Sequence, residues 1–195
     1  MPPVIQYFFD YVSPYSYLAD SQVPALLERT GADLVYRPML LGGVMQASGN
    51  APPATVPAKG KYMFTDIARW LERYGLELSF NPHFPVNTIH AMRGALIALD
   101  EDCFATYHQA MFTAMWREEK NLGDTEIFGA VVEAAGLDAE NLLRRIQEPD
   151  IKEQLKTNTA EAVERGAFGA PTFYVEDEMF FGNDRLDFLE ARLVQ

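Results

Sequence analysis

Near its start the chain reads Val4-Ile5-Gln6-Tyr7-Phe8-Phe9-Asp10-Tyr11-Val12-Ser13-Pro14-Tyr15-Ser16-Tyr17-Leu18-Ala19. The apolar first part of this segment is rich in aromatic and β-branched residues, which predicts a strand over residues 4–10. Ser13 and Pro14 are typical of a helix start, with serine as the N-cap and proline at the first helical position. A strand that turns at once into a helix directs the free N–H groups of that helix and the Ser13 hydroxyl toward one point. The turn is therefore either an ordinary capped helix start or a place where an anion binds.

Ser13 and Ser16 have the spacing of a Cys-x-x-Cys redox pair, although both are serines. The one cysteine of the chain, Cys103, lies far along the sequence, so an internal disulfide is excluded and a reducing compartment is indicated. Dithiol chemistry with the protein's own sulfur is therefore excluded at this turn. We expect any sulfur that reacts there to arrive on a ligand, and glutathione, the free tripeptide thiol of the cytosol, is the candidate.

A second informative segment lies near the other end, Gly166-Ala167-Phe168-Gly169-Ala170-Pro171-Thr172-Phe173-Tyr174-Val175. It is typical of a glycine-rich loop, a proline and a strand. A proline at the head of a strand is usually trans and only leaves one ladder position without an N–H. Together with Ser13, however, the segment resembles the thioredoxin superfamily, in which a cis-proline loop faces the N-terminus of the first helix.

Hydrophobic periodicity and turn residues predict the other elements. A helix over residues 14–29 and a strand over residues 33–38 complete a βαβ opening, and residues 39–57, with Gly42-Gly43 and three prolines, are expected to form a loop. Helices are predicted next, then a strand hairpin and a last helix. The predicted ranges are 58–74, 88–99, 103–117, 125–135, 138–147 and 150–165 for the helices, 172–176 and 178–181 for the strands, and 184–193 for the last helix.

The chain also resembles one family within this superfamily. Four segments are similar to the signature of the 2-hydroxychromene-2-carboxylate isomerases and the kappa-class glutathione transferases, and they follow one another in the same order. This resemblance implies an α/β fold, a thioredoxin-like domain with a large inserted all-helical domain, as in DsbA. The expected division is residues 1–38 plus 166–195 for the thioredoxin-like, glutathione-binding domain and residues 39–165 for the helical insertion. The four segments are Phe9-Asp10-Tyr11-Val12-Ser13-Pro14-Tyr15-Ser16-Tyr17-Leu18, Gly49-Asn50-Ala51-Pro52-Pro53, Phe168-Gly169-Ala170-Pro171-Thr172-Phe173 and Phe181-Gly182-Asn183-Asp184-Arg185-Leu186.

The resemblance also implies that glutathione is the cofactor. Ser13 is then catalytic, because its hydroxyl donates a hydrogen bond to the glutathione thiolate and, with the helix start, lowers the pKa of that thiol. Ala170 pairs with the cysteinyl part through its backbone, as an added strand does. Asn183 and Asp184 either receive the γ-glutamyl end or serve as a helix N-cap and a first-turn acid. The implied glutathione-binding residues are Ser13, Asn50, Lys59, Ala170, Pro171, Phe181, Gly182, Asn183 and Asp184.

Substrate recognition is expected from cations and hydrogen-bond donors around an aromatic-sized cleft. Lys59 supplies a local cation in an acidic chain, or simply faces solvent. The tyrosines supply phenolic donors or pack in the core, and the arginines supply a planar fork of donors or pair with surface acids. Asn87-Thr88 either helps to enclose the substrate or caps a helix. The predicted substrate residues are Tyr15, Arg37, Lys59, Tyr62, Asn87, Thr88 and Arg93.

Three functions are compatible with these residues. The first is glutathione-dependent cis-trans isomerisation of the 2-hydroxychromene-2-carboxylate type, in aromatic hydrocarbon catabolism, where reversible thiolate addition makes a double bond briefly single. The second is a kappa-like transferase that conjugates glutathione to an electrophile, and residues 49–60 resemble the transferases as much as the isomerases. Residues 85–89 also lack a basic pair associated with some isomerases. The third is a non-catalytic DsbA-like module that binds peptides.

Composition limits the partners. The formal net charge of −12 argues against nucleic acid and repels an anionic substrate at long range, so an anion site must be made locally. No apolar run approaches the ~18 residues needed to span a bilayer, and no export signal is visible. His83, His90 and His108 lack metal-ligand spacing, so no metal is assigned. We expect a cytoplasmic protein that acts on a small aromatic carboxylate or another electrophile, and the resemblance implies a homodimer.

Overall fold

The computed structural model describes residues 2–194 and contains one four-stranded sheet. Its strands are β1 (Val4–Phe9), β2 (Asp33–Pro38), β3 (Thr172–Val175) and β4 (Glu178–Phe181), in the order β2-β1-β3-β4. β1 pairs with β2 in parallel and with β3 antiparallel, and β3 and β4 form an antiparallel hairpin. The pairing of β1 with β3 brings the two ends of the chain together, and the α/β fold predicted from the sequence is confirmed.

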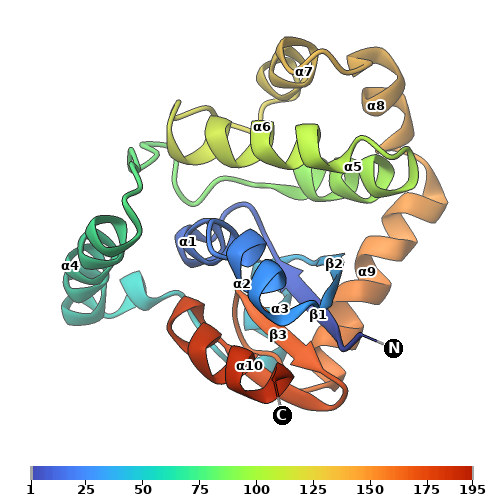
Figure 1. Cartoon of the computed structure of the whole chain (residues 1–195). Coiled ribbons are helices and arrows are strands. Elements are labelled where there is room, and N and C mark those ends of the chain that lie inside the picture. The colour runs from blue at the N-terminus through green and yellow to red at the C-terminus, as the bar shows by residue number, and fades with distance from the viewer. Residues whose placement is uncertain (1, 195) are drawn as a thin grey trace.

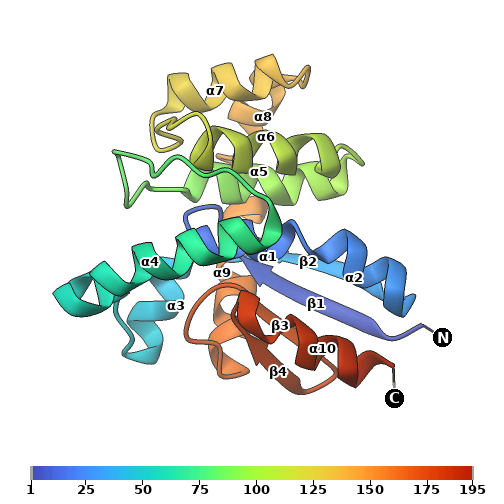
Figure 2. The same cartoon turned by 60° about the vertical axis from the view of Figure 1, so that its left-hand side comes forward.

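Helices lie on both sides of this sheet and above it (Figure 1). α5 to α8 form a separate layer, α4 lies at one side of the molecule, and α9 runs from the helical layer down beside the sheet, as Figure 2 also shows. α3 and α9 contact each other. The bounds are α1 (Pro14–Asp20), α2 (Val23–Thr30), α3 (Leu41–Ser48), η1 (Pro53–Thr55), α4 (Pro57–Tyr74), α5 (Ile89–Asp100), α6 (Phe104–Trp116), α7 (Thr125–Ala134), α8 (Ala139–Arg145), α9 (Pro149–Glu164), η2 (Asn183–Arg185) and α10 (Leu186–Leu193).

The side chains of β1 divide the apolar interior into two cores, because successive residues of a strand point to opposite faces. Tyr7 and Phe9 belong to a large buried cluster that continues into α5, α6 and α7. Phe8 points the other way and packs with Val44 of α3 and Ala162 of α9. The sheet and the helical layer therefore share the larger of these two cores. The division into two domains at residues 38/39 and 165/166 stays a prediction.

The expected single helix over residues 14–29 is wrong, since the structure divides it into α1 and α2. Pro24 lies in the first turn of α2, where its missing N–H needs no partner. In the interior of a continuous helix the same proline would remove one hydrogen bond and clash with the preceding turn. The chain therefore breaks at Ser21 and Gln22, and α1 is only 7 residues long.

The expected loop over residues 39–57 is also wrong in part, because it contains α3 and the short η1. α3 has no side-chain cap of its own. Its first N–H groups are bound by distant side chains instead: Leu40 donates to the Thr159 hydroxyl at 3.0 Å and Leu41 to the Asp10 carboxylate at 2.9 Å. This helix start depends on tertiary contacts, which local sequence patterns do not report.

The Asp10 carboxylate joins three segments at the end of β1. It accepts hydrogen bonds from the Thr88 hydroxyl at 2.6 Å, from the Val12 N–H at 3.1 Å and from the Leu41 N–H at 2.9 Å. Asp10 is only 2% exposed. Burial raises the pKa of this carboxyl, and the three donors oppose that rise. The turn before α1, the start of α3 and the start of α5 are therefore held by a single side chain.

We predict that Asp10→Ala lowers the free energy of unfolding by about 3 kcal/mol or more, because it leaves a buried hydroxyl and two partly buried N–H groups without an acceptor. Thr88→Val is the matched control. It removes one donor and leaves the other two bound, so its cost is expected at about 1 kcal/mol. Denaturant unfolding of both variants provides the comparison. Equal costs would contradict the role assigned to Asp10.

Candidate active site

Ser13 lies between β1 and α1 and is the N-cap of α1, with Pro14 in the first turn. Its Oγ accepts the Ser16 N–H at 3.1 Å and donates to the Ala170 carbonyl at 3.0 Å. Ser13 is 2% exposed. The helix start and the late proline loop, which are 157 residues apart, are thus in direct contact, and the Ala170–Pro171 peptide bond is cis. The structure brings together the two segments that the sequence singled out.

Three successive carbonyls of the proline loop are each bound by a side chain. Asn50 Nδ2 donates to Phe168 O at 2.8 Å, the Thr172 hydroxyl donates to Gly169 O at 2.9 Å, and the Ser13 hydroxyl donates to Ala170 O. The Phe168 ring packs on Phe181, with ring centroids 4.4 Å apart. A Cβ on Gly169 would lie 2.7 Å from the Phe181 ring, so this close packing requires glycine. These contacts hold the loop against the end of β4.

The turn after β4 lies beside this loop, since the Gly182 N–H donates to Pro171 O at 3.0 Å. Gly182 has a φ of 96°, which favours glycine, and a Cβ there would lie 2.5 Å from an Asp184 carboxylate oxygen. Asn183 is 3% exposed, and its buried Nδ2 has no hydrogen-bond partner among the described residues. Asp184 is ion-paired with Arg185. Neither Asn183 nor Asp184 caps α10.

Three predicted substrate residues line one hollow of about 380 Å³ between α1, η1 and α4. Tyr15, Lys59 and Tyr62 contribute to it, and Met63 forms part of its wall. The Tyr15 hydroxyl donates to the Asp66 carboxylate of α4 at 2.9 Å. Burial, that hydrogen bond and the charges of Asp66 and Asp184 raise the pKa of Tyr15 well above its ordinary value. A cation and two phenols therefore surround a space beside the helix start.

Comparison with known proteins agrees with this geometry. The model of the DSBA-like thioredoxin domain matches residues 4–194. The chain belongs to this family. It is 34% identical over 196 residues to a 2-hydroxychromene-2-carboxylate isomerase of Sphingobium xenophagum, covering 100% of both chains. It is 30% identical over 202 residues to glutathione S-transferase kappa 1 of Rattus norvegicus, covering 96% of this chain and 89% of the relative.

A solved structure of a 2-hydroxychromene-2-carboxylate isomerase shares the fold of this family member. Its TM-score is 0.86 at 31% sequence identity, and the match covers 97% of this chain and 94% of the other. The resemblance that four sequence segments indicated is thereby confirmed. These two curated relatives are enzymes by name, and the match covers 100% and 89% of their lengths.

The other predicted substrate residues are bound elsewhere. Arg37 pairs with Glu161 of α9 and lies over the Phe8 ring. Arg93 donates to Ile146 O at 3.4 Å. Asn87 Oδ1 accepts the Ile89 N–H at the start of α5, and Thr88 binds Asp10. Among the described residues, no hydrogen bond links these four to Ser13 or to the proline loop.

Sequence reasoning missed the residues that support the site. Asp10 was not assigned a role, although a single acidic residue directly after an apolar strand indicates a buried carboxylate with hydrogen-bond partners. Asp66, the partner of Tyr15, stood on the polar face of a helix and had no such signal. His108 binds Asp20 at 2.8 Å and the Tyr11 hydroxyl at 3.0 Å. Within residues 2–194 no group of His, Cys, Asp or Glu is arranged to hold a metal ion.

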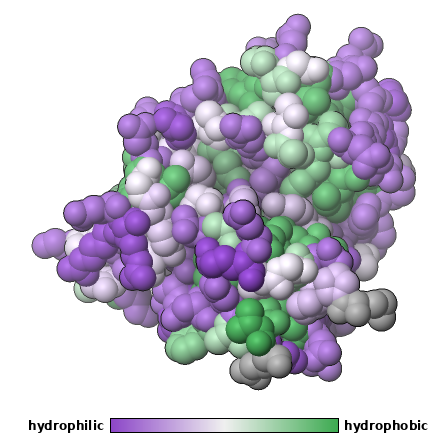
Figure 3. Space-filling view, in the orientation of Figure 1, coloured by the Kyte–Doolittle hydropathy of each residue, from purple (hydrophilic) through white to green (hydrophobic). Residues whose placement is uncertain are grey.

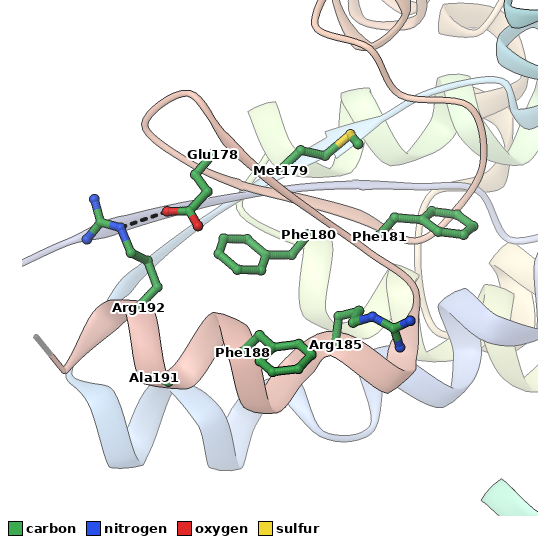
Figure 4. A pocket seen from close by; sticks show the side chains of 8 residues that line it. All are labelled: Glu178, Met179, Phe180, Phe181, Arg185, Phe188, Ala191 and Arg192. Atoms are coloured by element: carbon green, nitrogen blue, oxygen red, sulfur yellow. Dashed lines mark hydrogen bonds and ion pairs between the residues drawn. The ribbon is translucent and has the colours of Figure 1, made fainter.

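A larger hollow of about 720 Å³ lies away from Ser13, between the open edge strand β4 and α10. Figure 4 shows the rings of Phe180 and Phe188 in the space between the strand and the helix, while Met179 and Phe181 point away from it. Arg192 and Glu178 close one end with an ion pair. Figure 3 shows hydrophobic residues in this lower part of the molecule and more of them in the upper part of the same face, between hydrophilic ones. In the described residues, no helix has the length and apolar character that crossing a membrane requires.

We predict different stability effects for the two serines of the helix start. The buried Ser16 hydroxyl has no partner among residues 2–194, so Ser16→Ala is expected to leave the free energy of unfolding unchanged or slightly higher. Ser13→Ala removes an N-cap and leaves the Ala170 carbonyl without its donor, at a cost of about 1–2 kcal/mol. Denaturant unfolding of both variants tests this. A larger loss for Ser16→Ala than for Ser13→Ala would contradict the hydrogen-bond assignment.

Proposed function

We propose that the protein is a glutathione-dependent isomerase of the 2-hydroxychromene-2-carboxylate type. The observation that carries this proposal is the direct contact between the Ser13 hydroxyl and the Ala170 carbonyl. This contact brings a neutral hydrogen-bond donor and a backbone acceptor to one buried point. A cysteinyl group would pair with both of them once they separate from each other. The full-length similarity to isomerases of this name supports the choice of reaction.

In this proposal Ser13 stabilises a thiolate and does not itself attack. Its Oγ keeps the Ser16 N–H as a donor, which polarises the hydroxyl and makes its proton a better partner for a negative sulfur. A hydrogen bond to the charged form lowers the pKa of a thiol. Because α1 is shorter than the sequence predicted, more of this effect falls to the hydroxyl and less to the helix dipole.

The residues around the turn after β4 fit the γ-glutamyl end of glutathione. Asn183 Nδ2 is a buried donor without a partner, which a ligand carboxylate would satisfy. Asp184 offers a carboxylate to the ligand ammonium once Arg185 releases it. On the other side, Asn50 fixes the proline loop, and Lys59 adds a cation that compensates locally for the net negative charge of the chain.

The hollow beside α1 is the proposed place of the substrate. Lys59 would hold its carboxylate, and Tyr62 and the phenol edge of Tyr15 would contact its aromatic part. When bound, glutathione supplies a thiolate that adds reversibly to a conjugated carbon, so that the neighbouring double bond can rotate and form again. Asp66 keeps Tyr15 in place through the hydrogen bond to its hydroxyl. As part of the same proposal, the protein acts as a cytoplasmic homodimer on a small molecule, without nucleic acid or membrane.

Glutathione binding and free-thiol accounting test this proposal. Glutathione at a hundred times its dissociation constant should raise the free energy of unfolding by about 2.7 kcal/mol, seen as a higher melting temperature. During turnover of a chromene carboxylate the total free thiol should stay constant. Loss of thiol with a chlorinated aromatic, and no turnover of the chromene, would favour a kappa-like transferase. Absence of any thermal shift would favour a peptide-binding module.

We predict that Ser13→Ala raises the pKa of the bound thiol by about one unit, because a hydrogen bond to the thiolate is lost. The acid limb of the pH–rate profile should therefore move to higher pH by the same amount. Asp138→Ala is the matched control, since it removes the N-cap of α8 in the helical layer and should leave that pH unchanged. An unshifted profile in Ser13→Ala would remove Ser13 from the catalytic role.

A further inference from the structure

The hydroxyl of Ser13 has one proton, so it can donate only one hydrogen bond at a time. Oγ accepts the Ser16 N–H on one side and donates to Ala170 O on the other. Both ends of this bond are buried, since Ser13 is 2% and Ala170 7% exposed. The hydroxyl can therefore donate to a thiolate only by leaving the Ala170 carbonyl.

The Ala170 carbonyl has no second donor within residues 2–194. The carbonyls of Phe168 and Gly169 are bound by Asn50 and Thr172, and neither donor reaches the next residue. Ala170 lies just before β3, outside the ladder that pairs Thr172 with Phe181. A buried carbonyl that loses its only donor is costly. When the Ser13 hydroxyl turns away, the Ala170 carbonyl thus requires a replacement hydrogen-bond donor.

Resting on the proposed function, we propose that Ser13 and Ala170 form a coupled pair that ionises only a thiol carried by a cysteinyl amide. The amide N–H of the ligand takes over the Ala170 carbonyl, and the freed Ser13 hydroxyl turns to the sulfur. A simple alkyl thiol has no such N–H, so its ionisation would leave the carbonyl unpaired. The ligand class is therefore peptides of cysteine, and the selectivity lies in the exchange of one hydrogen bond.

Two ester analogues of glutathione test the exchange. In the first, the N–H between the γ-glutamyl and cysteinyl groups is replaced by oxygen. In the second, used as the control, the amide between the cysteinyl and glycyl groups is replaced in the same way. The thiolate absorbance of each bound ligand is titrated with pH and corrected for the thiol pKa of the free ligand, and calorimetry gives the affinity at each pH.

In the unmodified protein, the bound thiol pKa should be about one unit higher for the first analogue than for glutathione, and unchanged for the second. In Ser13→Ala the difference in bound thiol pKa between glutathione and the first analogue should disappear, because there is no serine hydroxyl whose hydrogen bond can be exchanged. Equal thiol pKa values for all three ligands, or a difference that persists in Ser13→Ala, would overturn this inference alone. Failure of glutathione to bind the unmodified protein would overturn both the inference and the proposed function.

Discussion

The buried carboxylate of Asp10 is the constraint on which the site depends. It accepts a backbone N–H from the turn that leads to Ser13, a second from the start of α3 and a hydroxyl from the segment before α5. The local sequence of these three segments does not fix their positions relative to one another. Because one side chain satisfies all three, the position of the Ser13 hydroxyl is coupled to the packing of the helical layer on the sheet.

The predictable parts of the fold are those with local causes. Strands are predicted over residues 4–10 and 33–38 because their patterns are apolar and β-rich. The ends of the helices predicted over 58–74, 125–135 and 150–165 follow from the glycines after them, Gly75, Gly136 and Gly166. The break between α1 and α2 was missed, although Pro24 contains the signal, because the apolar periodicity continues across it. α3 was missed for another reason: Gly42-Gly43 disfavours a helix locally, and the hydrogen bonds that start it come from Asp10 and Thr159.

The candidate site divides in the same way. The approach of the proline loop to the start of α1 was predictable, because both segments resemble the thioredoxin superfamily, but the hydrogen bond between Ser13 and Ala170 was not predicted. Lys59, Tyr15 and Tyr62 come together because α4 packs against α1. Arg37 was a less reliable prediction, since an arginine on a strand can pair with an acid on the helix that faces it. Here Arg37 pairs with Glu161 of α9. Residue type alone does not tell which side chains face the hollow and which pair with a neighbouring acid. That depends on which helix packs beside each residue.

A serine at this position also fits the charge of the chain. With a net charge of −12, long-range electrostatics oppose a thiolate anywhere on the molecule. A buried hydroxyl acts only over hydrogen-bond distance and carries no charge that needs burial, so it stabilises an anion without a permanent cation in the core. Such a donor must be satisfied when no ligand is present, or its burial would be costly. The Ala170 carbonyl meets that requirement. In the proposed mechanism, the bond that satisfies the Ser13 hydroxyl in the free protein is the one that a ligand exchanges.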